Sequence, residues 1–525
     1  MEKRIDKSNL KSSDILLVNL PYPIKYLAAD AVEDYRGGHL GQGYLAAVLE
    51  QNNIPCELVD CPRLGINFNA LVSMIKEQQP LVIGFHFYHI NVHFLYRLLG
   101  LLKNMERKPL ILLGGRQATA TADSILKSNP MVDCVILSEG EITLLNIVTK
   151  YLQGIEWKDE EGIAYLDGDN NVIYTEPRQL VMDLDTLPFP KRIFLPNQKR
   201  AGLCTTRGCY GKCTFCSMNQ FYDFAKGQRF RTRTPKNVVD EIEMLYKNGI
   251  EFIMSDSDNF LMSDRLNPGW IDEFCRLMKE RDIHIRYQIY ARNDDITYER
   301  INKLKEVGLH CIFIGVESGI QERLKAFRKN ITVENSIKAI LLLHEMGVKV
   351  KIGHIVFDPY TKIADLLQEI EFLRKINFKE TGAYLAEPFS IRFPLSIYPG
   401  TEIHDRLKEQ NLLSNDTEYG FSFIDNNMYI YLSKIQKWQE MLRLLTWKYT
   451  RNYYYVEDLK DEILFDKMTK VIGKIISLDM DVIEELVKQI ILKGEKAEIS
   501  MESYQELESY LDEMKELSDS VGCVS

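Results

Sequence analysis

The sequence lacks an excess of basic side chains. Its 65 lysine and arginine residues are outnumbered by 75 aspartate and glutamate residues, so the formal net charge is −10. Proteins that bind DNA or RNA usually carry a basic surface, because phosphate contacts supply much of their affinity. A short basic segment at residues 229–233 is the one local exception that we note. The charge balance therefore predicts no nucleic-acid partner.

The sequence also lacks an uninterrupted hydrophobic run of membrane-spanning length. A spanning helix needs about 20 consecutive, predominantly apolar residues. The stretch from Leu81 to Leu102 is interrupted by polar side chains, namely His86, His89, Asn91, His93 and Arg97. A strand, a loop and a helix explain this stretch better. The first fourteen residues are polar and contain no apolar core of a signal peptide. We therefore expect no membrane association and a cytoplasmic location.

Cysteine is too scattered for a disulfide framework, and it clusters at one place only. Residues 207–216 read RGCYGKCTFC and bring together Cys209, Cys213 and Cys216. Four thiolates would complete a zinc or iron–sulfur site, whereas three leave one metal position without a protein ligand. The spacing Cys-x3-Cys-x2-Cys can bind three corners of a [4Fe–4S] cluster. Structural zinc is the alternative and needs a fourth ligand, for which Cys204 is the nearest candidate, at a spacing that makes no standard zinc motif.

The first third of the sequence predicts an α/β fold. Residues 14–153 alternate five short β-rich runs with five helical patterns, which is typical of a doubly wound parallel sheet. Such sheets bind ligands at the carboxyl ends of their strands. The loops expected there include residues 86–91, 114–117 and 138–141. Gly114 and Gly115 directly follow an apolar run and would allow a ligand to approach the backbone closely.

A second series of strands and helices follows. Residues 154–198 are rich in turns and prolines and predict a linker, so the first domain is expected at residues 1–153. Residues 199–410 contain six predicted strands, of which the last is SIRFPLSIYP at 390–399, and they predict a partial (β/α)6 barrel. The active face of such a barrel lies at the carboxyl ends of its strands. Residues 411–525 predict a helical C-terminal region.

The cysteine motif, with the aromatic Phe215 before its last cysteine, resembles the signature of the radical S-adenosylmethionine (SAM) superfamily. In that superfamily the open iron binds SAM. The segments SDSDNF at 255–260, GVESG at 315–319, GHIVF at 353–357 and YPGT at 398–401 extend the resemblance. The resemblance implies cysteine ligation of a [4Fe–4S] cluster and SAM contacts at Phe215, Asp256, Asp258, Asn259, Arg292, Glu317, Ser318 and His354.

The N-terminal sheet resembles the cobalamin-binding domain that precedes the barrel in one branch of these enzymes. The matching segments are HLGQGYLAAVLEQ, LLGGRQATATADSIL and VDCVILSEGEITLL. This resemblance implies cobalamin contacts at Tyr88, His89, Gly114, Gly115, Glu139 and Gly140. The Asp-x-His-x-x-Gly motif that supplies a cobalt ligand in other cobalamin proteins is absent. Cobalt ligation by His86 or His89, packing by these residues, and loss of cobalamin binding all stay open.

The resemblance implies an enzyme in which the cluster reduces SAM to methionine and a 5′-deoxyadenosyl radical. Methylcobalamin would then deliver a methyl group to an unactivated carbon of a peptide or a small natural-product precursor. The electron donor is expected to be a protein such as flavodoxin or ferredoxin. Cyclisation or rearrangement, with or without cobalamin, is the alternative reaction.

Three further functions are less well matched. A methylthiotransferase needs a second three-cysteine cluster, which Cys56, Cys61 and Cys134 match poorly. An iron–sulfur electron carrier or a cobalamin-responsive binding module needs no SAM pocket, so GVESG and SDSDNF argue against both. The sequence itself assigns no catalytic residue beyond the cofactor contacts.

Overall fold

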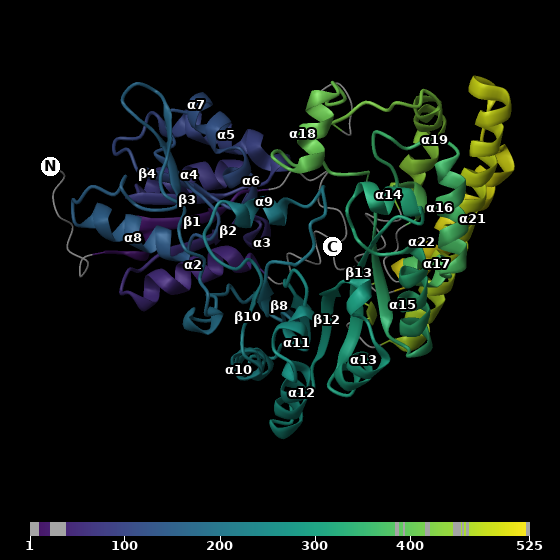
Figure 1. Ribbon diagram of the computed structural model, residues 1–525, viewed down its shortest axis with the longest axis horizontal. Helices are drawn as coiled ribbons and strands as arrows, with labels where there is room; N and C mark the ends of the chain where they lie inside the picture. Colours follow the sequence, from purple (N-terminus) through teal and green to yellow (C-terminus); the bar gives the residue numbers. More distant parts are fainter. Residues whose placement is uncertain are drawn as a thin grey trace. The chain divides into compact units, whose positions relative to one another are not determined.

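The computed structural model describes residues 10–21, 38–383, 388–391, 394–414, 420–444, 453, 456–457 and 461–520. The chain forms two compact units (Figure 1). Unit 1 consists of Met1–Tyr210, Cys216–Ile285 and Tyr398–Thr401, and unit 2 of Gly211–Phe215, Arg286–Ile397 and Glu402–Ser525. The division falls inside the region that the sequence predicts as one barrel. The predicted domain boundaries stay predictions.

Unit 1 contains a seven-stranded sheet in the order β2-β1-β3-β4-β5-β6-β7. Its first five strands are parallel: β1 (Ile15–Asn19), β2 (Glu57–Asp60), β3 (Val82–His86), β4 (Leu110–Gly114) and β5 (Cys134–Ile136). The strand order reverses at β1, which confirms the predicted doubly wound sheet. Two antiparallel strands, β6 (Ile163–Leu166) and β7 (Val172–Tyr174), extend it. Part of the segment expected to be a linker therefore belongs to the sheet.

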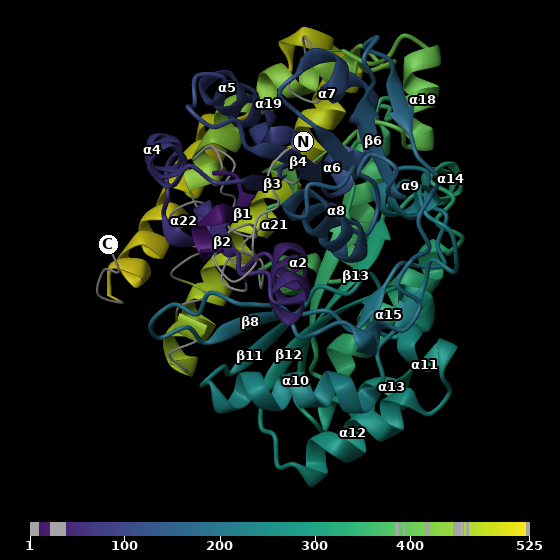
Figure 2. The same cartoon turned by 90° about the vertical axis from the view of Figure 1, so that its left-hand side faces the viewer.

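Helices cover both faces of this sheet (Figures 1 and 2). Ile15 and Leu17 of β1 pack in one core with side chains of α2 (Leu40–Gln51) and α8 (Glu141–Leu152). Leu16 and Val18 point the other way, because successive strand residues face opposite sides. Their core includes residues of α4 (Phe68–Gln78), α5 (Val92–Leu102) and α7 (Ala122–Ser128), while α3 (Cys61–Leu64) and α6 (Arg116–Ala120) are short. Burial on both faces explains why these strands read as continuous apolar runs.

The remainder of unit 1 contains two strand pairs. Strand β8 (Arg200–Leu203) pairs in parallel with β11 (Phe252–Ser255), and β9 (Thr206–Arg207) pairs antiparallel with β10 (Arg231–Thr232). The helices here are α9 (Ser217–Asp223), α10 (Pro235–Lys247), α11 (Met262–Leu266) and α12 (Trp270–Glu280). The Thr234 side chain caps α10 by accepting a hydrogen bond from the Asn237 amide. Strand β9 leads directly into the cysteine motif.

Unit 2 contains the parallel strands β12 (Arg286–Ala291), β13 (Leu309–Glu317) and β14 (Lys349–His354). The helices that follow these strands are α13 (Tyr298–Lys305), α14 (Gln321–Ala326), α15 (Val333–Glu345), α16 (Asp365–Lys375) and α17 (Phe378–Ala383).

The sixth predicted strand, at 390–399, is wrong for the residues that the structure describes there. Phe389–Ile391 is a 3-10 turn, residues 394–398 form no strand, and residues 392–393 lie outside the described part of the chain. The Ser390 amide donates to the Asp479 carboxylate at 2.9 Å instead of to a neighbouring strand.

The C-terminal region is helical, as predicted. It contains α18 (Glu402–Glu409), α19 (Asn427–Leu444), α21 (Glu462–Lys493) and α22 (Met501–Asp519), and α21 packs against α16, α17, α19 and α22. The buried carboxylate of Asp479 on α21 accepts hydrogen bonds from Ser390 and from the Trp438 indole. Within the described ranges, we find no helix with both the length and the apolar character needed to cross a membrane.

Candidate cofactor site

The three cysteines follow strand β9 and end at the start of α9. The turn after β9 requires Gly208, because its φ is +80° and a Cβ there would lie 2.1 Å from the carbonyl oxygen of Arg229. The Gly208 amide donates to the Asp258 carboxylate at 2.6 Å. All three thiols are half-buried and none is in a disulfide.

The donor set suits an iron–sulfur cluster. Three soft thiols match the ligand preference of iron–sulfur clusters. The described residues form no group of three or more His, Cys, Asp or Glu side chains that converge on a single metal ion. A cluster, by contrast, needs thiolates spread over three separate irons. Cys209 and Cys216 belong to unit 1, and Cys213 belongs to unit 2.

Cys204 does not behave as a fourth ligand. Its Sγ lies 3.3 Å from the Thr206 carbonyl oxygen, to which it donates as a neutral thiol. Burial raises the pKa of Cys204 to about 12, although part of the residue still contacts solvent. Metal ligation requires a thiolate, so this environment argues against the zinc alternative.

The SDSDNF segment supports the start of the cysteine loop. Ser257 Oγ accepts the Thr205 amide at 2.8 Å, and Asp258 accepts the Gly208 amide. Desolvation by the surrounding protein raises the pKa of Asp256 to about 6, against the opposing charges of Arg192 and Arg116, although the residue itself is exposed. The structure thus places Asp256, Asp258 and Asn259 at the end of β11, as predicted.

The GVESG segment ends β13 in unit 2. Glu317 adopts a φ of +67°, which is rare for a residue with a side chain. Its carboxylate pairs with the buried Lys329 ammonium at 2.7 Å. Arg292, which follows β12, donates to the Lys329 carbonyl at 3.0 Å and pairs with Asp294. Arg292 and Glu317, two predicted SAM contacts, therefore both bind Lys329, a residue that the sequence patterns did not indicate.

Two further predicted SAM contacts bind a buried glutamate. Glu369 of α16 accepts hydrogen bonds from Ser318 Oγ, from the Gly319 amide at 2.7 Å and from His354 Nε2 at 2.9 Å. Burial would raise the pKa of Glu369, but His354 and Arg323 lower it below its usual value, so it is a carboxylate. The side chains of His354 and Glu369 have no exposed surface. SAM contact by Ser318 or His354 stays a prediction, and the visible role of both is to support the strand end.

In the parallel sheet of unit 1, His86 occupies the end of central strand β3. Its ring lies 4.1 Å from the His39 ring and 4.7 Å from the Tyr88 ring, centroid to centroid. Burial, with the nearby His39 and Arg116, lowers its pKa well below the usual value, so the imidazole is neutral. His86 Nδ1 is buried without a hydrogen-bond partner among the described residues. His89 lies farther out, where its ring contacts that of Tyr398.

The two glycines that follow the apolar run of β4 have different surroundings. A Cβ on Gly115, whose φ is +95°, would lie 2.6 Å from the His86 ring, whereas a Cβ on Gly114 would meet no atom of the described residues within 4 Å. The space beside Gly115 is therefore filled by protein. The space beside Gly114 can admit a ligand, which fits a cofactor bound at this strand end.

A buried four-charge group connects the end of the sheet to the cysteine loop. Its members are Glu139, Glu141, Arg207 and Arg231. Arg207 donates to Glu139 at 3.0 Å and to Glu141 at 2.6 Å, and Arg231 donates to Glu139 at 2.8 Å. Arg207 lies two residues before Cys209, so this group fixes where that loop begins. The Glu139 side chain is thus engaged by arginines, and its contact with cobalamin stays a prediction, as does that of Gly140.

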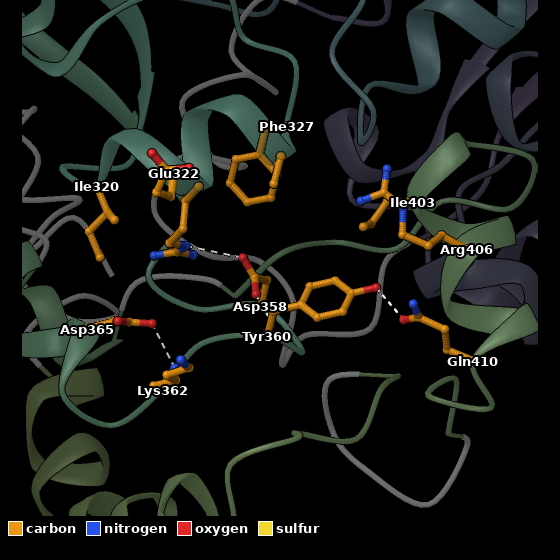
Figure 3. Close-up of a pocket in the computed structure, with 12 residues that line it drawn as sticks. Ile320, Glu322, Phe327, Asp358, Tyr360, Lys362, Asp365, Ile403, Arg406 and Gln410 are labelled. Carbon is orange, nitrogen blue, oxygen red and sulfur yellow. Dashed lines mark hydrogen bonds and ion pairs between the residues drawn. The ribbon is translucent and has the colours of Figure 1, made fainter.

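Unit 2 has a pocket beside the cysteine loop. It measures about 470 Å³ and lies between α14, α18 and the loop after β14. Figure 3 shows the rings of Phe327 and Tyr360 between Glu322 on one side and Arg406 on the other. Phe327 also packs edge-on against Phe215, and its carbonyl accepts the Thr214 amide at 3.0 Å. One wall of the pocket therefore supports the segment between Cys213 and Cys216.

Several important residues were not indicated by the sequence, chiefly Lys329, Glu369, Arg207 and Arg231. Each is a charged residue whose burial depends on a partner distant in the chain. Arg207 adjoins the cysteine motif, and Lys329 follows GVESG by ten residues, so proximity to a motif was the available signal. Nothing in the helical pattern distinguished Glu369 from the exposed Glu371 on the same helix.

Two sequence families match separate parts of the chain. Residues 203–373 match the Radical SAM superfamily, and residues 30–148 match the B12 binding domain. The first domain implies SAM and a [4Fe–4S] cluster, and the second implies cobalamin. Both sets of predicted cofactors are therefore supported on one polypeptide.

Similar proteins include methyltransferases and cyclases. An uncharacterized methyltransferase, PH0819 of Pyrococcus horikoshii, is 26% identical over 77% of this chain and 85% of its own length. The anaerobic magnesium-protoporphyrin IX monomethyl ester cyclase of Rubrivivax gelatinosus is 29% identical over 58% of this chain and 56% of its own length. The solved structure of OxsB, a cobalamin-dependent SAM radical enzyme, superimposes with a TM-score of 0.71 at 20% identity, over 96% of this chain and 75% of OxsB. That likeness establishes the fold.

The thiol assignments can be tested by iron content. Anaerobically purified wild-type protein should carry about four irons per chain, and replacement of Cys209, Cys213 and Cys216 by alanine should remove almost all of them. Cys204→Ala is the matched control and should keep its iron, because Cys204 is a protonated structural thiol. Iron retention by the triple variant, or zinc in its place, would contradict the assignment.

The four-charge group predicts a specific loss of stability. Burial would raise the pKa of Glu139, but Arg207 and Arg231 lower it below its usual value. Its stabilising contribution is therefore present above the unfolded pKa and is lost as the pH falls below about 4.3. Glu139→Gln should lower the free energy of unfolding at pH 7 by about 3–5 kcal/mol, because it leaves two buried arginines undercompensated.

Denaturant unfolding between pH 3 and pH 7 measures this effect. The matched control is Glu176→Gln, which removes a carboxylate that is 78% exposed. The control should unfold like the wild type at every pH. Equal unfolding free energies for Glu139→Gln and the wild type at pH 7 would show that the group adds no stability.

Proposed function

We propose that this chain, which is a cobalamin-dependent radical SAM enzyme, transfers a methyl group to an unactivated carbon of a small natural-product precursor or a peptide. The observation that carries the proposal is the presence of a B12 binding domain and a Radical SAM domain on one polypeptide. The name of PH0819 as a methyltransferase supports the same reaction. The OxsB structure, which has aqua-cobalamin and SAM bound, supports the same pair of cofactors.

The cofactors supply chemistry that amino acids lack. When bound, a reduced [4Fe–4S] cluster supplies the electron that cleaves SAM, and cobalamin supplies the carrier for the methyl group. The chain supplies three thiolates from Cys209, Cys213 and Cys216. Asp258 holds the start of this loop through the Gly208 amide.

We assign SAM to the strand ends that carry the remaining predicted contacts. Carboxylates and amides there, at Asp256, Asp258 and Asn259, can accept hydrogen bonds from an ammonium or a ribose. In unit 2, Lys329 binds one oxygen of Glu317 and thereby orients this carboxylate. Glu369 fixes the following two residues. Phe215 and Arg292 complete the proposed contacts.

We assign cobalamin to the carboxyl ends of β3, β4 and β5. Gly114 leaves its backbone open toward this edge, and the neutral His86 has a buried Nδ1 that makes no hydrogen bond to any described residue. Tyr88 and His89 follow β3 directly in the chain. For Gly115 and Glu139, which the sequence predicts as cobalamin contacts, we retain contact through the backbone only. The His86 ring fills the space beside Gly115, and an arginine binds the Glu139 carboxylate.

Two parts of the proposal concern partners and location. An external electron donor such as flavodoxin or ferredoxin would reduce the cluster, in a cytoplasmic setting. Radical cyclisation is the second candidate reaction, and the cyclase relative of Rubrivivax gelatinosus specifically favours it.

Product analysis distinguishes methylation from cyclisation. Because the methyl group must come from SAM, methylation leaves S-adenosylhomocysteine, whereas radical cleavage of SAM leaves 5′-deoxyadenosine. Anaerobically reconstituted protein, reduced with dithionite, should form both products from SAM, and S-adenosylhomocysteine should require added cobalamin. Mass spectrometry with methyl-deuterated SAM would locate the label in candidate substrates encoded beside this chain.

The controls separate the two cofactors. The triple cysteine variant should form no 5′-deoxyadenosine. Formation of 5′-deoxyadenosine without any cobalamin-dependent S-adenosylhomocysteine would refute methyl transfer and favour cyclisation.

Cobalamin retention tests the proposed strand-end site. Gly114→Leu should retain far less cobalamin than the wild type after anaerobic gel filtration, because its side chain would occupy the open space beside β4. Gly168→Leu is the matched control. A Cβ on Gly168 would also meet no described atom within 4 Å, and Gly168 lies in the turn between β6 and β7, away from this strand end. Absorption spectra report the bound cobalamin. Equal retention by both variants would place the cofactor elsewhere.

A further inference from the structure

Lys329 lies in the segment between α14 and α15, with its side chain only 8% exposed. Lysine is rarely buried unless it is paired. Its Nζ donates to Glu317 Oε1 at 2.7 Å in a buried ion pair. Arg292 donates to its backbone carbonyl at 3.0 Å, which fixes this segment beside the end of β12.

The sequence of β13 is shaped around this ion pair. A Cβ on Gly315 would lie 2.5 Å from Lys329 Nζ and 2.6 Å from Glu317 Oε1. Any side chain at this position would therefore displace the ammonium or the carboxylate. The glycine of GVESG makes room for the pair, which indicates that the pair is a built feature of the strand end.

The same segment runs beside the cysteine loop. The Thr214 amide donates to the Phe327 carbonyl at 3.0 Å, and Thr214 Oγ1 donates to the Ala326 carbonyl at 3.4 Å. These bonds hold the residue after Cys213 against the chain that carries Lys329. The ion pair with Glu317 keeps Lys329 in its ordinary cationic form, so this segment carries a positive charge next to the chain of Cys213.

We propose that Lys329 is a positioning residue that places a fixed positive charge beside the Cys213 ligand of the cluster, raises the reduction potential of the cluster and holds the Glu317 carboxylate at the end of β13. The inference rests on the proposed [4Fe–4S] site. Reduction potentials of such clusters depend on nearby charge, and a charge interacts strongly where water is excluded. Reduction adds one electron, taken from the external donor, and breaks no bond in Lys329.

A redox titration of the reconstituted full-length protein tests this electrostatic role. Without SAM or substrate, the reduced cluster is quantified by electron paramagnetic resonance at set potentials. Lys329→Met should lower the ratio of reduced to oxidised cluster about tenfold at a fixed potential, which is about 59 mV for one electron. Glu317→Gln removes the negative member of the pair and should shift this ratio in the opposite direction.

Two controls separate charge from structure. Lys329→Arg keeps the charge and should titrate close to the wild type. Lys325→Met removes a cation that is 64% exposed and paired with Glu322, and it should leave the potential unchanged. Iron content is measured for every variant.

The outcomes are distinct. Opposite shifts in Lys329→Met and Glu317→Gln support the proposal, and shifts in the same direction, or none, overturn it. If Lys329→Met assembles no cluster, the other two variants test the proposal. Glu317→Gln must then raise the reduction potential of the cluster, and Lys329→Arg must leave it unchanged. Absence of a [4Fe–4S] cluster from the wild-type protein would instead refute the proposed function.

Discussion

The buried carboxylate of Glu139 links the end of the unit 1 sheet to the cysteine loop. Two arginines from the paired strands β9 and β10 converge on it, and Glu141 balances the second positive charge. Removing any one member leaves a buried charge without compensation, which costs about 3–5 kcal/mol. The end of the parallel sheet and the start of the cysteine loop are therefore fixed by the same four side chains. The position of Cys209 relative to the sheet is a consequence of this arrangement.

Unit 2 uses buried ion pairs in the same way at the end of β13. Glu317 is held by Lys329, and Glu369 is held by His354 and Arg323. Both ion pairs hold one short segment: the first binds the side chain of Glu317, and the second binds Ser318 and Gly319 through Glu369. A residue with a φ of +67° is costly to maintain, and these bonds supply the support. The strand end is thus pre-organised before any cofactor binds.

Much of the fold follows from local sequence patterns, and much of the site does not. Alternation of apolar runs and helical patterns predicted β1 to β5, and the cysteine spacing indicated the candidate cluster loop. The strands β6 (IAYL) and β7 (VIY) were missed because apolar runs of only four and three residues, in a segment rich in turn residues, are too short to show a strand period. The strand predicted at Ser390 failed because its backbone is bound by Asp479, 89 residues away. Lys329 and Glu369 were missed for the same reason: their burial depends on distant partners that no local pattern encodes.

A glycine can be required because neighbouring protein leaves no room for a side chain, or because a ligand approaches the backbone. The sequence alone does not distinguish these two reasons at the glycines of the site. Gly115, Gly208 and Gly315 each adjoin a position already filled by protein, respectively the His86 ring, the Arg229 carbonyl and the Lys329 ion pair. Their lack of a side chain is explained by packing, and none of them needs a ligand. Gly114 differs, because neither a crowded neighbour nor a positive φ requires glycine there. Gly168 in the β6–β7 turn has equally open surroundings, so open space by itself does not identify a ligand. What distinguishes Gly114 is its position at the carboxyl end of β4, where parallel sheets of this kind bind ligands, and this position is the reason for the cofactor contact that we propose there.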